Sequence, residues 1–246
     1  MGMGKTTKYI MKKQLLYILF VFSFCHCYNG QGLLSYFKWE ADGLETEKFD
    51  RIAIDVTWNH WKKSPPGINQ GLYSFGFGAY WFKDMPIGKK SNAAVALGFG
   101  FESLNFHHNG NFTTLSSSPN ISSLVPFPND SVIRTNKLAV NYVDIPIEFR
   151  FRTINKTLED RMKFNFKLYL GFKAGFLVNN HSKYKNDNIK FKIYNLDHIL
   201  PYRYGPYIRL GFNKISFVGF YSMTSIFDKN GPNLIPFHIG ISWMRF

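Results

Sequence analysis

Charged residues recur within segments of the chain that are otherwise rich in large apolar residues. In these segments the charges share every second position with glycine and tyrosine, and bulky apolar side chains occupy the positions between them. Buried charges persist only when they are paired and hydrogen-bonded, so we expect acids and bases to interleave in one interior network. We interpret this network as structural, with a proton or solute path as the alternative, and its register stays open at this stage. Its predicted members are Asp55, Glu102, Asp144, Glu148, Arg150, Lys167, Lys173 and Arg209.

A second group of cationic residues lies in segment 179–203, which we predict to be a loop. Aromatic residues are interleaved with these charges. A solvated loop surface is one interpretation, and contact with an anionic surface glycolipid or a partner protein is the other, because basic residues are attracted to anionic membrane surfaces. The candidate contact residues are Lys183, Lys185, Lys190, Lys192 and Arg203.

The adjacent pair His107-His108 is a candidate for metal binding or catalysis. Neighbouring residues of a strand point to opposite faces, so the pair makes a poor chelate, and no acid or cysteine lies near it with ligand spacing. Glu102 and Ser103 lie a few residues before His107, but they also alternate in facing. We therefore predict no metal, no cofactor and no catalysis, with an outer-rim enzyme acting on lipid or peptide as an alternative.

Alternation with a period of two predicts that these residues are held on β-strands. One face of each segment is almost purely large and apolar, whereas the other carries glycine, tyrosine and charges. In a small membrane barrel the apolar residues meet lipid and the small or polar residues fill the crowded lumen. The facing of 215–227 is unclear, Pro146 is expected to form a bulge, and the last strand is expected to slip phase near Met244 before it ends at Phe246. The predicted strand segments are 52–59, 73–81, 95–102, 143–152, 164–176, 207–212, 215–227 and 237–246.

The connections between these segments alternate in length. Short turns on one rim and long loops on the other are typical of outer-membrane barrels, and backbone groups in lipid require the sheet to close. We therefore predict an all-β fold, an eight-stranded antiparallel up-and-down transmembrane β-barrel, with the eighth strand paired to the first. The short connections are 84–91, 153–162 and 213–214, the long ones are 60–71, 105–136 and 179–203, and 226–235 is intermediate.

The N-terminus predicts export. Met11-Lys12-Lys13 precedes an apolar run over residues 15–24 that is too short to span a bilayer as a helix. We assign residues 1–30 to a signal peptide, whose true start could be Met11, residues 31–49 to a short periplasmic segment, and residues 50–246 to the barrel. Both cysteines, Cys25 and Cys27, fall in the leader, so we expect no disulfide in the mature chain.

Composition supports a barrel over a helical membrane protein. Aromatic residues make up 18% of the chain, yet the mean hydropathy is only −0.18. The net charge of +14 is spread over turns and strand interiors, so we expect anionic lipid head groups and no nucleic acid as partners.

The segment Tyr142 to Arg152, YVDIPIEFRFR, resembles a strand motif of the PorT-like outer-membrane β-barrel family. Supporting stretches are Asp50-Arg51-Ile52, Gly98 to Phe101, Gly171 to Gly175 and Tyr204 to Gly211. The resemblance covers roughly residues 50–246 and implies an eight-stranded outer-membrane barrel. The namesake of the family is a component of the type IX protein-secretion and gliding machinery.

Together these features predict a monomeric outer-membrane barrel with a plugged polar lumen. We expect it to act through long outer loops on outer-membrane lipid, lipopolysaccharide or partner proteins, with secretion-machinery proteins among the candidates. A small-solute porin and a soluble lipocalin-like carrier are the remaining alternatives.

Overall fold

The computed structural model describes residues 51–87, 93–115, 120–128, 133–153, 166–212 and 214–245. The signal peptide expected at 1–30, the segment expected at 31–49 and the expected end at Phe246 lie outside the described residues. The strands are β1 (Ile52–Lys62), β2 (Phe75–Pro86), β3 (Ala93–His107), β4 (Gly110–Leu115), β5 (Ile121–Pro126), β6 (Thr135–Arg152), β7 (Phe166–Lys185), β8 (Lys190–Tyr194), β9 (Tyr202–Phe212), β10 (Ile215–Tyr221) and β11 (Ile235–Arg245).

Over these ranges, no helix has the length and apolar character needed to cross a membrane.

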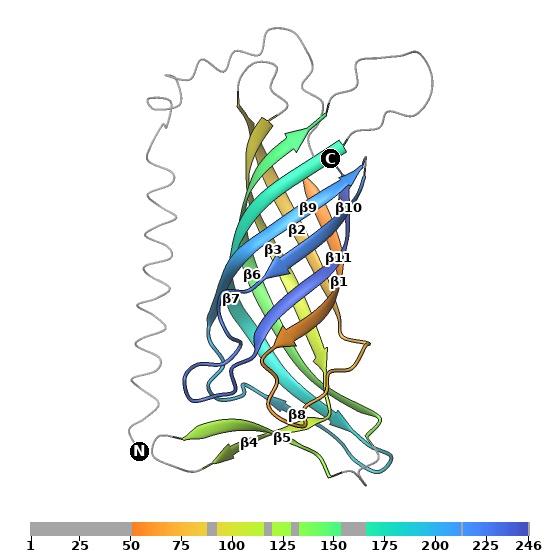
Figure 1. Cartoon of the computed structure of the whole chain (residues 1–246), viewed down its shortest axis with the longest axis vertical. Coiled ribbons are helices and arrows are strands. Elements are labelled where there is room, and N and C mark those ends of the chain that lie inside the picture. The colour runs from red at the N-terminus through yellow and green to blue at the C-terminus, as the bar shows by residue number, and fades with distance from the viewer. Residues whose placement is uncertain are drawn as a thin grey trace. The chain divides into compact units, whose positions relative to one another are not determined.

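Eight of the strands close into an antiparallel up-and-down barrel (Figure 1). Around the barrel the order is β1, β2, β3, β6, β7, β9, β10 and β11, and β11 returns to β1. The closing pair runs in continuous register from Ile52↔Arg245 to Lys62↔Ile235. The expected pairing of the first and last barrel strands is thereby confirmed, and the described strands of the barrel wall leave no lipid-facing sheet edge.

The two phases of each strand face opposite sides of the wall, as the alternation predicted. On β6, Ile147 and Phe149 are exposed on the outside, whereas Glu148 and Arg150 are buried in the lumen. The ambiguous segment after residue 214 follows the same rule, with Phe217 outside and other side chains inside. The apolar residues thus face outward, which is the opposite of a soluble carrier with an apolar interior cavity.

Pro146 does not form the expected bulge. Its pairing with Lys173 on β7 lies in unbroken register, and on the β3 side the register is the same before and after it, at Leu97↔Ile147 and Gly100↔Asp144. The register shift of this strand lies instead between Asn141 and Tyr142, opposite β7. Proline has no N–H to donate to a ladder, and the pairing of β3 with β6 omits Gly98 and Phe99 beside it, while the buried ring of Pro146 packs close to Gly98 in the lumen.

The last strand does not slip phase before Arg245. Ile241 and Trp243 face outward, and Ser242 and Met244 are fully buried between and after them. Met244 joins an inner apolar cluster with Phe82 and Tyr169, so its burial continues the alternation.

The two longest predicted loops contain strands. The strands β3, β6 and β7 are 15, 18 and 20 residues long, and all three extend into the segments expected to be loops. Segment 105–136 also contains the hairpin β4–β5, and segment 179–203 contains β8, which pairs with the end of β7 (Figure 1). The sequence analysis assigned β4, β5 and β8 to loops because these strands are only five or six residues long and lie outside the segments of sustained alternation.

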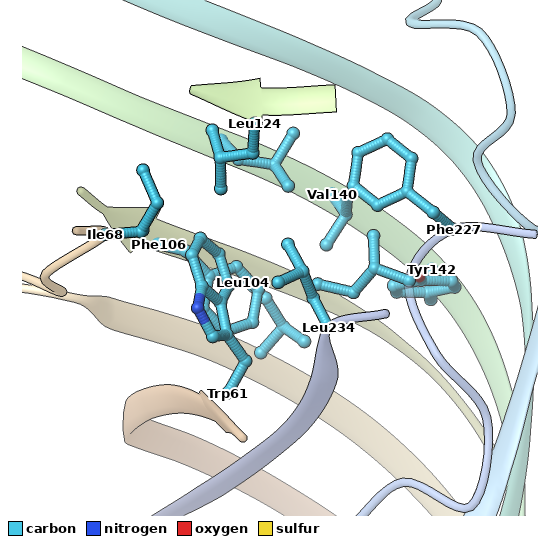
Figure 2. Packing of buried hydrophobic residues seen from close by; sticks show 11 residues of the cluster. Trp61, Ile68, Leu104, Phe106, Leu124, Val140, Tyr142, Phe227 and Leu234 are labelled. Atoms are coloured by element: carbon cyan, nitrogen blue, oxygen red, sulfur yellow. The ribbon is translucent and has the colours of Figure 1, made fainter. Parts of the chain in front are cut away.

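An apolar cluster fills the outer end of the barrel (Figure 2). Trp61 and Phe106 come from the wall, Leu124 from the hairpin β4–β5, and Ile68 and Phe227 from connecting loops. Trp61 and Phe106 are almost completely buried, with ring centroids 5.0 Å apart. The long outer segments therefore fold back over the lumen and are held there by apolar burial.

Candidate functional site

The middle of the lumen contains a cluster of acids and bases drawn from four strands. Lys173 on β7 donates from Nζ to Oε2 of Glu102 on β3 at 2.8 Å. Arg203 on β9 pairs with Glu102 as well, and its Nη2 lies 2.9 Å from Oδ2 of Asp144 on β6. The hydroxyl of Tyr80 donates to Asp144 at 3.1 Å. Lys173 Nζ also lies 3.6 Å from Oδ2 of Asp144, so each carboxylate in this cluster contacts two cations.

A second cluster lies around Arg209 of β9. Its guanidinium contacts Asp55 through two nitrogens and Oε1 of Glu148 through Nε at 3.1 Å. Glu148 also accepts hydrogen bonds from Arg150 Nε at 2.5 Å and from the hydroxyl of Tyr207 at 2.7 Å. All of these groups are buried, so the pairs are shielded from solvent screening.

The clusters continue to Asp84 near the inner end of β2. Its carboxylate accepts from Arg150 Nη1 at 2.5 Å and also pairs with Arg152. Arg152 in turn donates from Nε to the hydroxyl of Tyr169 at 2.8 Å. Arg150 thus joins Asp84 to Glu148, which links this end of the lumen to the cluster around Arg209.

The structure places all eight predicted lumen residues inside the barrel. Lys167 is buried beside Arg152, its register partner across β6 and β7. Sequence reasoning left out Asp84, Arg152 and Arg203. Asp84 and Arg152 share the lumen phase of their strands, so a consistent count of alternate positions would have found them.

The structure contradicts the prediction that was made for Arg203 from the sequence. It was expected to contact an anionic surface from an outer loop, but only 2% of its surface is exposed and it lies within the lumen clusters. The reason is that β9 begins at Tyr202, so Arg203 occupies the same inward phase as Gly205, Tyr207 and Arg209. Its guanidinium also stacks over the ring of Tyr142 at 4.1 Å.

The charged side chains of the lumen are held in fixed pairs. Within the described part of the chain, each lumen carboxylate contacts at least one Lys or Arg side chain. Aromatic rings pack over the cations, as where Lys173 lies 4.5 Å from the ring centre of Phe220. Such a paired interior is costly to break because removing one partner leaves a buried uncompensated charge.

Comparison with known proteins agrees with this geometry. A family model described as an outer membrane protein beta-barrel domain matches residues 52–228. The chain belongs to this family. As an outer-membrane β-barrel, it presents its apolar outer wall to the lipid of the outer membrane.

None of the curated proteins matches this outer-membrane barrel. Among solved structures, the attachment invasion locus protein Ail of Yersinia pestis is similar over 80% of this chain and 97% of its own, with 12% sequence identity and a TM-score of 0.38. A likeness at this level carries no argument about what the barrel does.

The histidine pair at the outer end of the barrel is split between two faces. His108 is buried beside Phe112 and Asn136, whereas His107 is half-buried on the opposite side of the strand. Glu102 lies in the lumen and Ser103 on the outer wall. Across the described ranges, no group of three metal-ligating side chains is brought together.

The predicted surface lysines lie on a β-hairpin. Lys183 pairs in register with Lys192, and Lys185 with Lys190. Lys190 and Lys192 are exposed and the other two are half-buried. The same surface includes Lys137, which lies on β6 directly opposite Lys183 and which the sequence reasoning did not single out.

A cavity of about 130 Å³ lies near this hairpin. It is lined by Phe112, Thr113, Thr114, Ser122, Ile193, Asn195, Leu196, Asp197 and Phe227.

Proposed function

We propose that this outer-membrane barrel is a sealed interaction protein that passes no solute and acts through the outer ends of its strands and loops. The single observation that carries the proposal is the filling of the lumen. Ion-paired side chains occupy its inner and middle parts, and the apolar cluster around Trp61 and Phe106 occupies its outer end (Figure 2).

Opening such a lumen would require several buried pairs to break together. Arg203 and Arg209 each contact two carboxylates, so neither can move without stranding charge. Breaking one buried pair by removal of a partner costs about 3–5 kcal/mol, and an eight-stranded barrel has an interior just wide enough for its own side chains. The lumen is therefore suited to rigidity, and the outer segments carry the variable surface.

The test is conductance of the purified full chain in planar lipid bilayers. We expect no discrete channel openings, because a sealed lumen leaves no continuous aqueous path. Bilayers that receive detergent alone and bilayers that receive a general porin provide the baseline and the positive control. Reproducible unitary currents from the barrel would overturn the proposal.

The resemblance of Tyr142 to Arg152 to the PorT-like motif supports a second candidate function, a role in type IX secretion-machinery assembly. The inward members of this segment, Asp144 and Glu148 among them, hold the lumen clusters, so an interaction with secretion proteins would use other surfaces. The test is co-purification of the tagged barrel from detergent-extracted outer membranes, with an unrelated tagged barrel as control. We expect type IX components to co-purify with this barrel and not with the unrelated control barrel. Equal recovery with the two barrels would reject the role.

We assign no catalytic role to His107. Glu102 points into the lumen, where it is paired with Lys173, while Ser103 and His107 lie on the outer wall. These three side chains therefore do not share a site. Hydrolysis of lipid or peptide by the purified barrel, lost in His107→Ala, would contradict this assignment.

A further inference from the structure

A row of positively charged side chains crosses adjacent strands on the outer wall. Strand pairing places Lys137 on β6 directly opposite Lys183 on β7, and Lys183 directly opposite Lys192 on β8. We refer to these three residues as the lysine row. Lys185 and Lys190 form a second rung of the same hairpin, two residues further out.

The lysine row faces away from the lumen. On β6 the flanking residues Asn136 and Leu138 are buried inside, so Lys137 points to the opposite side. On β7, Asn180 is buried inside, and Lys183, three residues further along the strand, points to the opposite side. Because side chains alternate along a strand, the row lies on the exterior of the barrel, above its apolar belt.

The positive charge of this surface is not neutralised within the protein. Like charges directly opposite each other on neighbouring strands are destabilising. Among the residues that the structure describes, no carboxylate forms an ion pair with a lysine of either rung, and Asp187 at the hairpin tip pairs with Arg134. Lys137 donates to Oδ1 of Asn105 at 2.7 Å, a neutral partner. An external anion would relieve this repulsion.

The height of the row above the apolar belt indicates what kind of anion it meets. Val143 is the last apolar outward residue of β6 before the polar Asn141, and it lies six positions from Lys137. Six residues span about 20 Å along a strand, or about 15 Å of height at a tilt of about 40°. The head-group layer of a phospholipid bilayer is only about 5–8 Å thick on each side. A glycolipid with phosphorylated sugars extends further from the hydrocarbon and fits this height better.

We infer that the lysine row binds the phosphate groups of a phosphorylated glycolipid lying beside the barrel in the outer leaflet. This inference deepens the proposed function by naming the partner class for one face, and it rests on the outward presentation of these strands. It does not depend on the lumen being sealed. The conductance experiment can therefore reject the sealed lumen while glycolipid binding is still observed, and the reverse is also possible.

The experiment measures binding of the refolded full chain in detergent micelles to lipopolysaccharide and to the same lipopolysaccharide after chemical dephosphorylation. The variant is Lys137→Gln/Lys183→Gln/Lys192→Gln. Each lysine near an anionic surface contributes roughly fivefold to affinity, so we expect the triple variant to bind roughly 100-fold more weakly at low salt. Dephosphorylation should weaken binding by the wild-type chain to a similar extent.

The matched control removes three exposed lysines elsewhere, Lys83→Gln/Lys214→Gln/Lys229→Gln, with the same change in net charge. We expect this control to lose less than about twofold in affinity for lipopolysaccharide. The variant Lys137→Arg/Lys183→Arg/Lys192→Arg should retain binding, because it keeps the positive charges. Heat-modifiable gel mobility checks that every variant folds. Equal losses in both triple variants, unchanged binding in the row variant, or equally tight binding to phosphatidylglycerol vesicles would each overturn the inference.

Discussion

Arg209 and Asp55 form a bidentate ion pair across the lumen, with Nη1–Oδ1 2.6 Å and Nη2–Oδ2 2.8 Å. They are 154 residues apart in the chain, and in the sheet β10 and β11 separate their strands. The pair therefore joins two sides of the barrel through its interior. Two parallel hydrogen bonds add geometric specificity to the charge attraction.

Removing Arg209 should destabilise the barrel strongly. In Arg209→Leu, both Asp55 and Glu148 lose a cation while they remain buried, so we expect a loss of about 3–5 kcal/mol in the free energy of unfolding. Urea unfolding in lipid vesicles, followed by tryptophan fluorescence, measures this loss. The control is Arg134→Leu, which breaks an exposed pair with Asp187 and should cost at most about 1 kcal/mol. Similar costs for the two variants would contradict the buried network.

A charge placed on the lipid-facing wall should also be costly. Leu170 is 51% exposed on the outside of β7, and Leu170→Arg should cost roughly 2–4 kcal/mol if its side chain lies near the bilayer midplane. Val125 is similarly exposed, but on the outer hairpin β4–β5, so Val125→Arg should be nearly neutral. The same unfolding assay compares them. A neutral Leu170→Arg would mean that the faces of β7 are assigned the wrong way round.

Gly98 should not tolerate even a methyl group. A Cβ at this position would lie 2.6 Å from Cδ1 of Phe82 and 2.8 Å from Cγ of Pro146, and Phe82 is completely buried. We expect Gly98→Ala to cost about 1–3 kcal/mol through overpacking. At Gly219 the nearest atom would be 3.7 Å away, so Gly219→Ala should be neutral or stabilising by up to about 1 kcal/mol. Equal unfolding midpoints for the two variants would refute this packing argument.

The outer end of the barrel should loosen in acid. Burial lowers the pKa of His108 to about 4, with a smaller contribution from His107, whereas the unfolded value is about 6.5. Because the unfolded form takes up the proton more readily, the stability that depends on neutral His108 is complete above about pH 6.5. It declines by up to about 1.4 kcal/mol per pH unit as the pH falls toward 4.

The same proton would remove a local hydrogen bond. The amide of Gly110, at the start of β4, donates to Nδ1 of His108 at 3.2 Å, which requires that nitrogen to be unprotonated. Hydrogen exchange of the β4–β5 amides, corrected for intrinsic rates, should therefore accelerate between pH 7 and pH 5. In His108→Gln this acceleration should be absent, and its persistence there would point to another group.

The segment Tyr142 to Arg152, which resembles the PorT-like strand motif, has a physical interpretation in the structure. Its outward members, Ile145 and Phe149 among them, cover the lipid-facing wall, and its inward members Asp144, Glu148 and Arg150 join separate clusters in the lumen. The motif therefore describes how this strand is built into a barrel.

Where the alternation is clear, the amino-acid sequence by itself determined which residues face lipid and which face the lumen, and it indicated which connections are short. Both properties are local, because side-chain alternation repeats every two residues and needs no knowledge of the partner strand. For this reason the facing of Phe172 and Lys173, and the membership of all eight predicted lumen residues, could be read from the printed sequence.

Only the tertiary structure decided which charges meet and which lysines gather. The ion pairs of Arg209 and Arg203, like the lysine row, depend on strand register and on closure of the barrel, which join residues far apart in the chain. A shift of one residue at the start of β9 would move Arg203 from the lumen to the outer wall, because neighbouring positions face opposite sides. The alternation around Arg203 places it in phase with Tyr207 and Arg209, but only the structure showed that β9 begins early enough, at Tyr202, to include it.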